Sequence, residues 1–251
     1  MNREELLLKW KEEEAYGFYG WDFTHLDGRW ESESLPWDYK TIISAFLKKT
    51  DNLLDMGTGG GEFLLSLNHP YRNTYVTEAY EPNVRLCRKN LEPIGITVAH
   101  ITKDSCLPFQ DEMFDVIINR HESFDIDEVK RILKKNGIFI TQQVGGKNDS
   151  DLSERLCSHF RPQFPEHDLN FNKKLIEKTE FKILQKNEFF GKVKFYDVGA
   201  LVYFAKIIPW EFPGFQVESA QKILFQLQRE VDDIGYIKGT EHRFFIVAQK
   251  K

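Results

Sequence analysis

The sequence predicts an α/β protein built around a mostly parallel β-sheet. From residue 51 onward, short apolar runs alternate with amphipathic segments of helical length, which is typical of strands joined by crossover helices. The first apolar run leads into the glycine-rich stretch 55–61, which predicts a tight turn between a strand and a helix. The apolar run 243–249 predicts a further strand at the end of the chain. We therefore expect a sheet with helices on both faces.

The individual elements follow from the apolar pattern and from the residues at their ends. Strands are expected at 52–56, 74–78, 97–102, 114–119, 137–144, 181–189 and 243–249. Helices are expected at 3–15, about 38–48, 61–67, 82–91, 125–134, 149–160, 171–179 and about 216–233, while 197–208 fits an apolar helix or strand. Pro36 and Pro82 mark two helix starts, because proline suits the first helical turn. The cations Lys134 and Lys135, followed by Gly137, mark a helix end.

Length and composition predict a soluble, single-domain protein. The chain has 251 residues, of which 41% are hydrophobic and 29% are charged. Its formal net charge of −5 gives no overall attraction to nucleic acid or to an anionic membrane, so neither is expected as a partner. The 3 cysteines are scattered without a C-x-x-C pair, so neither disulfides nor a metal site are expected. A charged N-terminus and the lack of an apolar run of about 20 residues predict a cytoplasmic location.

The glycine turn predicts a site for a nucleotide-like ligand. Asp55 ends the first strand, and glycines follow at positions 57 and 59–61. Glycine permits positive φ angles and lets a ligand approach the bare backbone N–H groups. Glu62 stands where a dinucleotide-binding fingerprint needs its third glycine, and no Gly-Lys-Ser/Thr of a phosphate loop follows. The ligand therefore has to be identified from residues further along the chain.

Further polar residues lie at the expected ends of the next strands, which share one edge of a parallel sheet. Glu78 ends the second strand, roughly 20 residues after the turn, where a carboxylate can accept both hydroxyls of a ribose. A solvated acid at a strand end is the structural alternative for Glu78. Asp104 follows the third strand and can accept a hydrogen bond from the exocyclic amine of adenine. Asn119 ends the fourth strand.

In order and spacing, these residues resemble the class I S-adenosylmethionine-dependent methyltransferases. The stretch 55–61, Asp-Met-Gly-Thr-Gly-Gly-Gly, resembles their motif I, D-x-G-x-G-x-G, and the blocks 104–109, 114–122 and 128–140 match their later motifs. The resemblance covers residues 50–145 and is closest to the ubiquinone/menaquinone-biosynthesis type. Asn136 departs from it, since a glycine commonly precedes Gly137. The resemblance implies a Rossmann-like, seven-stranded, mostly parallel sheet with an antiparallel last strand, and S-adenosyl-L-methionine as cofactor.

The resemblance also implies a division of roles along the chain. Asp55, Gly57, Thr58 and Gly59 would bind the methionine end of the cofactor, Glu78 and Ala79 the ribose, Asp104 and Ser105 the adenine, and Asn119 the region of the sulfonium and the amine. The whole chain, 1–251, would be one methyltransferase domain. Cap helices would occupy 1–49, the cofactor-binding half 50–145, and the C-terminal half 146–251 with an aromatic-rich insertion at about 195–235.

Methyl transfer requires the acceptor to be aligned with the methyl group while water is kept out. A general base is needed only if the acceptor carries a proton at neutral pH. His121 and Glu122, just past the fourth strand, are the candidates. A hydrogen bond that shapes this loop is the alternative role for His121, and an ion pair with Arg120 is the alternative for Glu122.

The aromatic segments on either side of the central region predict an apolar acceptor site, so a small-molecule acceptor is expected. The residues concerned are Tyr16, Phe18, Tyr19, Trp21 and Trp37 in the first segment, and Phe195, Tyr196, Tyr203, Phe204, Trp210, Phe212 and Phe215 in the second. Packing of these rings into a core is the alternative. An RNA or protein methyltransferase and a non-catalytic protein that binds S-adenosylmethionine remain alternatives for the whole chain.

Overall fold

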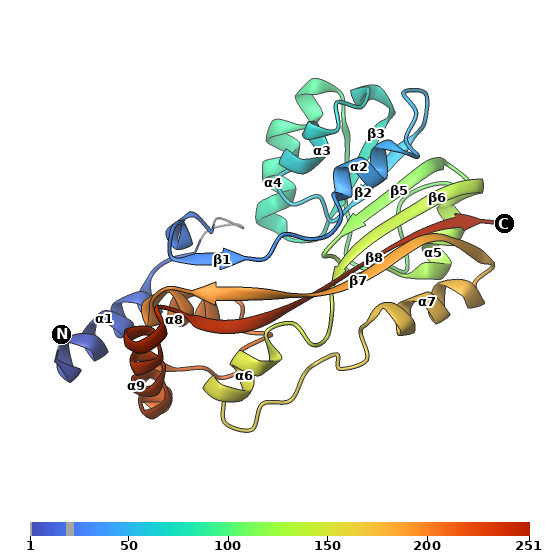
Figure 1. Cartoon of the computed structure of the whole chain (residues 1–251). Coiled ribbons are helices and arrows are strands. Elements are labelled where there is room, and N and C mark those ends of the chain that lie inside the picture. The colour runs from blue at the N-terminus through green and yellow to red at the C-terminus, as the bar shows by residue number, and fades with distance from the viewer. Residues whose placement is uncertain (1, 19–22) are drawn as a thin grey trace. The chain divides into compact units, whose positions relative to one another are not determined.

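The computed structural model describes residues 2–18 and 23–251 (Figure 1). The strands are β1 (Trp30–Ser32), β2 (Leu53–Met56), β3 (Thr74–Glu78), β4 (Thr97–His100), β5 (Phe114–Arg120), β6 (Leu133–Val144), β7 (Phe181–Phe195) and β8 (Ile237–Lys250). The α-helices are α1 (Arg3–Ala15), α2 (Tyr39–Ser44), α3 (Glu62–Ser66), α4 (Glu81–Asn90), α5 (Ile126–Ile132), α6 (Ser150–Leu156), α7 (Leu169–Lys178), α8 (Val198–Ile207) and α9 (Val217–Ile234). Short 3-10 turns are η1 (Thr24–Leu26), η2 (Tyr71–Asn73) and η3 (Glu92–Ile94). The strands described here form one sheet in the order β1-β7-β8-β6-β5-β2-β3-β4.

The chain divides into two compact units. Unit 1 comprises residues 1–35, 145–166 and 189–243, and unit 2 comprises residues 36–144, 167–188 and 244–251. Strands β7 and β8 contribute residues to both units. The sequence predicts that the whole chain functions as one methyltransferase domain with a cap, a cofactor-binding half and a C-terminal half. That division by function stays a prediction.

Unit 2 is a layered α/β structure in which successive strand residues point to opposite faces. On one face, Leu54, Ile117, Phe139 and Phe244 belong to a buried cluster that α5 and α7 complete. On the other face, the cluster of Leu53, Val116, Ile118, Ile138, Ile140 and Phe245 is completed by α2, α3 and α4. Both faces are therefore covered by helices, which explains why the strand sequences read as nearly continuous apolar runs.

The strand register brings the predicted site residues to one edge of unit 2. Strands β2, β3, β4, β5 and β6 pair in parallel, so their carboxyl ends lie at the same edge. Met56 pairs with Thr77 on one side and with Asn119 on the other. Asp55, Glu78 and the end of β5 are therefore neighbours in space. In the sequence, Asp55 and Asn119 are more than 60 positions apart.

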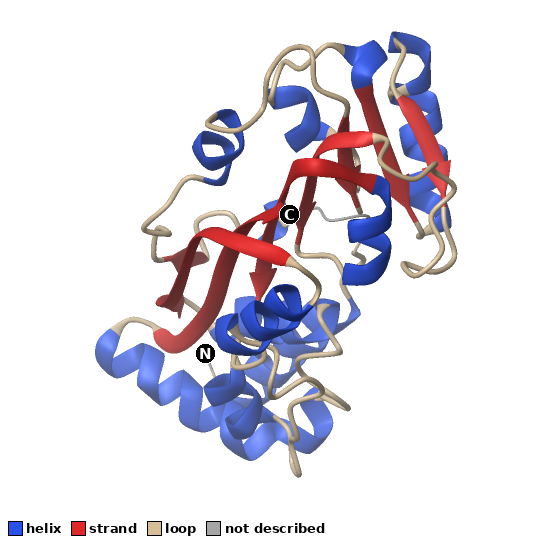
Figure 2. Ribbon diagram, turned by 90° about the vertical axis from the view of Figure 1, so that its right-hand side faces the viewer, coloured by secondary structure: helices blue, strands red, loops and turns tan. Residues whose placement is uncertain are grey.

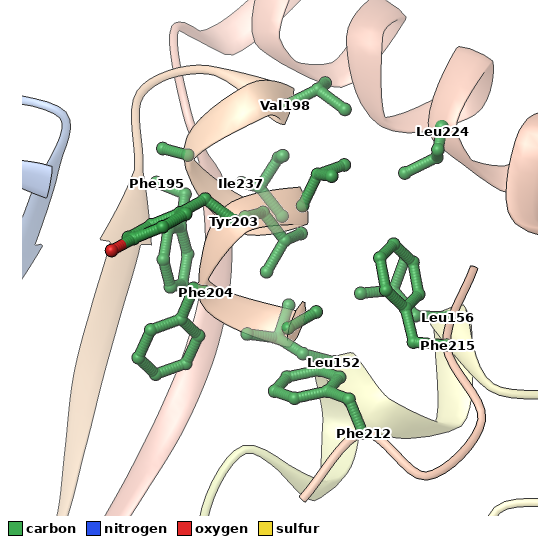
Figure 3. Close-up of a cluster of buried hydrophobic side chains, with 14 of the residues drawn as sticks. Leu152, Leu156, Phe195, Val198, Tyr203, Phe204, Phe212, Phe215, Leu224 and Ile237 are labelled. Carbon is green, nitrogen blue, oxygen red and sulfur yellow. The ribbon is translucent and has the colours of Figure 1, made fainter. Parts of the chain in front are cut away.

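Unit 1 has its own hydrophobic core, supplied mainly by α6, α8 and α9 together with Trp10 of α1. Figures 1 and 2 show the ribbons of these helices. Figure 3 shows side chains from α6, α8 and α9 packed with Phe195 of β7 and Ile237 of β8. A partly buried ion network joins α1 to the start of α8: Arg29 donates to Glu13 at 2.7 Å and to both carboxylate oxygens of Asp197 at 2.7 and 2.9 Å. Within the described ranges, 2–18 and 23–251, no helix has the length and apolar character needed to span a membrane.

The predicted α/β class is confirmed, with corrections to particular elements. The sheet has eight strands in the described residues rather than seven, because Trp30–Ser32 pairs antiparallel with 193–195 of β7. The helix expected to run to 134 ends at Ile132, and β6 begins at Leu133, which pairs with Phe114. The segment 197–208, left open between helix and strand, is the helix α8, with its N-terminus capped by Asp197.

Candidate functional site

The turn after β2 presents its backbone through three left-handed glycines. Gly57, Gly59 and Gly61 have φ angles of 67°, 63° and 86°, a region that side chains with a Cβ rarely adopt. The turn is tied to the neighbouring strand because the N–H groups of Gly57 and Thr58 both donate to the carbonyl of Thr77, at 3.1 and 3.3 Å. A Cβ on Gly59 would meet no atom within 4 Å, so this side of the turn is open. The expected strand–turn–helix geometry is therefore present.

Glu78 lies against this turn at the end of β3, and its side chain is buried. Its Oε2 accepts a hydrogen bond from the N–H of Gly59 at 2.9 Å, and its Oε1 accepts from Ala79 and Tyr80 at 3.0 and 2.9 Å. A carboxylate offers about four acceptor positions, so three backbone donors hold it in one orientation and leave little spare capacity. The alternative of a freely solvated strand-end acid is wrong for Glu78.

Asp55 is buried behind the turn, where its Oδ2 accepts a hydrogen bond from the Thr58 hydroxyl at 2.7 Å. The pKa of Asp55 is raised from 3.8 to about 7, chiefly by burial. The Thr58 hydrogen bond and the charge of Arg120 oppose this rise, and the charge of Glu78 adds to it. The carboxyl group therefore titrates near neutral pH. A cation placed at the turn would stabilise its ionised form.

Glu122 extends over the glycine turn from the loop after β5. A Cβ on Gly57 would lie 2.3 Å from the Cγ of Glu122, so only glycine at this position leaves room for the side chain. The Ser123 hydroxyl lies 2.6 Å from Oδ2 of Asp104 and 3.2 Å from Oε1 of Glu122. Desolvation raises the pKa of Glu122, the hydrogen bonds from Ser123 lower it, and the carboxylates of Asp104 and Glu78 raise it.

The structure thus gathers Asp55, Glu78, Asp104 and Glu122 around one glycine turn at the carboxyl edge of a parallel sheet. In open α/β sheets, this edge is where ligands bind. The backbone donors of the turn suit anionic or polar groups, and the acidic side chains suit hydroxyl, amine and cationic groups.

Comparison with known families gives this arrangement its identity. Residues 54–141, which run from the end of β2 to β6, match the family described as "Methyltransferase domain". Residues 54–141 are a methyltransferase domain. The cofactor of this class of domain is S-adenosylmethionine, and the chain is accordingly an enzyme that uses this cofactor. The search of curated proteins found no match.

Solved structures share the fold of the methyltransferase domain at low sequence identity. A Bacillus halodurans protein described as a methyltransferase is 15% identical, with a TM-score of 0.57, over 85% of this chain and 98% of that one. The YcgJ protein of Bacillus subtilis is 20% identical, with a TM-score of 0.56, over 85% and 97%. The [4+2]-cyclase SpnF is 15% identical, with a TM-score of 0.52, over 84% and 80%. These likenesses show a shared fold, and the cyclase shows that the fold alone does not determine the reaction.

A partly buried ion pair on α5 holds the segment 107–111 of the methyltransferase domain. Arg131 donates to Glu128 at 2.6 and 2.8 Å, to the carbonyls of Leu107 and Phe109 at 3.1 and 2.8 Å, and to Asp111 at 2.7 Å. Glu128 in turn accepts from the N–H of Leu107 at 2.6 Å. The block Glu128–Arg131 was matched to the family pattern in the sequence, but its role in holding this segment required the structure. Ser105 precedes the segment and is exposed.

Asn119 ends β5 as predicted, but its side chain is fully buried in a polar network. Its Oδ1 accepts from Thr141 at 2.8 Å and from Gln143 at 2.6 Å, and its Nδ2 donates to the carbonyl of Ser123 at 3.3 Å. A direct contact between this side chain and a cofactor would require the network to rearrange, and the predicted contact stays a prediction. Tyr39, which the sequence did not single out, donates to the backbone carbonyls of Asn119 and Ile140 at 2.9 and 3.0 Å.

His121 is the first residue after β5, and its backbone lies in the left-handed region with a φ of 59°. Its Nε2 lies 3.1 Å from Nε2 of Gln142, whose Oε1 accepts from the indole N–H of Trp37 at 2.8 Å. Since an indole N–H only donates, Gln142 must present its oxygen to Trp37 and its amide N–H to His121. The Nε2 of His121 is then an acceptor, and in the neutral ring the proton lies on Nδ1. The predicted hydrogen-bonding role is therefore present, and the predicted base role requires this ring to release Gln142.

Protonation of Asp55 predicts how the stability of the protein without cofactor depends on pH. The pKa is about 7 in the folded protein and 3.8 as the reference, so the folded state retains a proton that the unfolded state loses. The free energy of unfolding should fall as pH rises from about 4 to about 7 and then level off, with an upper limit of about 4 kcal/mol for this group. Urea unfolding of Asp55→Asn across this range should show a shallower fall than the wild type.

A matched variant separates this effect from a second buried acid. Glu211 of unit 1 also has a pKa raised by burial to about 7, and it accepts from the amide of Asn148 at 2.9 Å. Glu211→Gln should reduce the same pH dependence independently, since the two acids lie in different units. If the free energy of unfolding depends on pH in the same way in wild type and Asp55→Asn, Asp55 is ionised in the folded protein across this pH range.

Five of the twelve aromatic residues predicted to line an acceptor site belong to the core of unit 1 instead, while Tyr16, Tyr196 and Trp210 are exposed. Phe195, Tyr203, Phe204, Phe212 and Phe215 are at most 7% exposed and pack together (Figure 3). Packing, the alternative considered for these rings, is therefore confirmed for this set. Tyr19 and Trp21 lie outside the described residues. Trp37 differs, because it belongs to unit 2 together with the site.

Proposed function

We propose that the protein transfers the methyl group of S-adenosylmethionine to a small-molecule acceptor. The observation that carries the proposal is the Glu78 carboxylate, held by the N–H groups of Gly59, Ala79 and Tyr80 beside an open glycine turn. This arrangement suits a ribose at Glu78, the methionine end at Asp55, Gly57, Thr58 and Gly59, and the adenine at Asp104 and Ser105. Accepting two ribose hydroxyls would replace at least one backbone donor, because three of about four acceptor positions are already used.

The chain's residues would contribute mainly by binding and alignment. A lone pair of the acceptor attacks the methyl carbon, the carbon–sulfur bond breaks, and its electron pair returns to sulfur, leaving S-adenosylhomocysteine. An acceptor hydroxyl or amine also loses a proton, for which Glu122 and His121 are the nearest candidates. The raised pKa of Glu122 brings this carboxyl closer to the range in which a general base works at neutral pH.

The charge of the chain favours a small acceptor over nucleic acid. The formal net charge is −5, and the lysines of α7 and the following strand are interspersed with Glu177, Glu180 and Glu188. Lys173 lies 3.6 Å from Glu177, and Lys130 pairs with Glu180. A phosphate backbone would require a more uniformly basic surface.

A labelled-methyl transfer screen tests the proposal, with a metabolite extract and total RNA assayed in parallel. We expect the labelled methyl group to appear in a small-molecule fraction, and this labelling should be lost in Glu78→Ala. If the acceptor carries a proton, Glu122→Gln should reduce the rate of labelling at least tenfold. His121→Gln separates the two base candidates, since it should preserve turnover if Glu122 acts alone. Label in RNA alone would replace the small-molecule proposal with the RNA one. Cofactor binding without label in any fraction would favour the non-catalytic alternative.

A further inference from the structure

A groove of about 740 Å³ opens on unit 2, beside the segment that leads into α2. Its walls come from this segment, from α7, from the first half of β7 and from β8. Its volume lies within the range of about 300–1,000 Å³ that small-ligand sites occupy. None of the predicted cofactor-binding residues lines it, so it is separate from the glycine turn.

One part of the groove is apolar. Trp37 and Phe245 lie with their ring centroids 5.0 Å apart at an angle of 59°, and Ile42 and Leu184 extend this wall. Trp37, Ile42 and Leu184 are only partly buried, so apolar surface remains accessible on the groove side. Burying such surface against a ligand is favourable in proportion to its area.

The groove also carries cationic side chains. Lys186 on β7 and Lys173 on α7 both line it. Lys173 is partly neutralised by Glu177, at 3.6 Å. Lys186 makes no ion pair within the described part of the chain, and its side chain is exposed. The two lysines and one glutamate leave the groove with a net positive charge, which favours an anionic group on the ligand.

The apolar wall is connected to the reacting edge of the methyltransferase domain. The indole N–H of Trp37 donates to Gln142 at 2.8 Å, and the amide of Gln142 contacts His121 at 3.1 Å. Two hydrogen bonds through the Gln142 side chain therefore connect Trp37 in the groove wall with His121, the neighbour of Glu122 in the sequence. Trp37 is thus the lining residue that ties this groove to the carboxyl edge of the sheet, and Lys173 and Lys186 line the same groove.

We propose that this groove binds the methyl acceptor and that the acceptor is an amphipathic anion, with an apolar body against Trp37 and an anionic group at Lys186. The inference rests on the proposed function, which it sharpens by naming the substrate class. Carboxylate, sulfonate and phosphate share the recognition chemistry involved, since each accepts hydrogen bonds from an ammonium group. Trp37 belongs to the aromatic set that the sequence predicts for the acceptor site, and it lines this groove in unit 2.

A pair of fluorescent probes tests the binding site itself. The probes are 1-anilinonaphthalene-8-sulfonate and N-phenyl-1-naphthylamine, which share an aromatic body and differ in the sulfonate. We expect saturable binding of one equivalent of the sulfonate, weakened about fivefold or more in Lys186→Gln, with the neutral probe unaffected by that change. Trp37→Ala should weaken both probes. Lys182→Gln is the matched control, because Lys182 is an exposed lysine of the same strand that does not line the groove.

Equal binding of the sulfonate to Lys186→Gln and Lys182→Gln would overturn the assignment of the anion site. Calorimetric titration of S-adenosylmethionine serves as a separate readout, because Lys186→Gln should leave its affinity unchanged. If the wild-type protein does not bind S-adenosylmethionine, the proposed function is wrong, but the probe result still tests the groove as an anion-binding site.

The labelled product tests the link between groove and reaction. We expect the small-molecule product of the transfer screen to be retained both by an anion exchanger and by a reversed-phase resin. The sulfonate probe should inhibit its formation in wild type and about fivefold less effectively in Lys186→Gln. A product that passes through the anion exchanger would overturn the substrate class, and label insensitive to the probe would show that the acceptor binds elsewhere.

Discussion

Replacing Glu78 with alanine should weaken binding of S-adenosylmethionine by about 100-fold. A hydrogen bond to a charged group contributes about 1.5–3 kcal/mol, so losing two ribose contacts amounts to at least about 3 kcal/mol, and about 1.4 kcal/mol corresponds to a factor of ten. Removal of the carboxylate also releases the N–H groups of Gly59, Ala79 and Tyr80. Isothermal titration calorimetry with the purified variant measures the effect directly.

Two further variants make this result specific. Glu78→Gln keeps an acceptor oxygen but loses the charge, and we expect an intermediate loss of about tenfold. Glu81→Gln is the matched control, because Glu81 starts the next helix, is 53% exposed and pairs with the exposed Arg85. If Glu78→Ala retains its thermal unfolding profile and binds the cofactor with wild-type affinity, the ribose assignment is wrong.

Replacing Arg131 with methionine should lower the free energy of unfolding by about 2–3 kcal/mol, because Glu128 is buried whereas Arg131 is 34% exposed. The guanidinium joins α5 to the loop 107–111 through Glu128, Asp111 and two backbone carbonyls. Without it, Glu128 becomes an uncompensated buried charge, which is the costly case for a buried ion pair. The hydrogen bond from Arg131 also holds the pKa of Glu128 below its ordinary value, so this contribution is present above about pH 4 and is lost at lower pH. Urea unfolding at pH 7 measures the change.

Matched variants identify the fork geometry as the cause. Arg131→Lys keeps the charge but loses the planar fork of donors, and we expect an intermediate loss. Arg85→Met removes an exposed arginine that pairs with Glu81 one turn away, and should cost at most about 0.5 kcal/mol. An Arg131→Met protein as stable as Arg85→Met would show that the loop does not depend on this pair. Reduced cofactor affinity in Arg131→Met would place the loop 104–109 at the cofactor site.

The elements of unit 2 could be predicted from the sequence because both faces of its strands are buried. Runs such as 52–56 and 114–119 are therefore apolar throughout, and parallel pairing fixes which residues share an edge. The short strand β1 could not be predicted, because Trp-Glu-Ser carries no alternating pattern and depends on its antiparallel partner in β7. The start of β6 was misplaced since Leu133, Lys134 and Lys135 continue the helical pattern of α5, and only pairing with Phe114 makes Leu133 a strand residue.

The candidate site shows the same division between local and long-range information. Asp55, the turn glycines and Glu78 could be predicted because the strand–turn–helix motif is continuous in sequence and its spacing is characteristic. The contributions of Ser123, Gln142 and Trp37 could not, because each contacts residues on other elements through hydrogen bonds that leave no local pattern. The same limit applies to Phe195, Tyr203, Phe204, Phe212 and Phe215, which the sequence placed at an acceptor site. A segment rich in aromatic residues can form either a packed core or a binding site.

The Ser123 hydroxyl connects the two ends of the predicted cofactor site through a single proton. It lies within hydrogen-bond distance of Asp104, predicted to bind the adenine, and of Glu122, which lies over Gly57 of the predicted methionine site, but it has only one hydrogen to donate. A ligand group that takes the place of one of these bonds frees the hydroxyl for the other carboxylate. The affinities for the two halves of the cofactor are then thermodynamically coupled, and the coupling is reciprocal by linkage. Adenosine and methionine, bound separately and together, would therefore not show additive binding free energies.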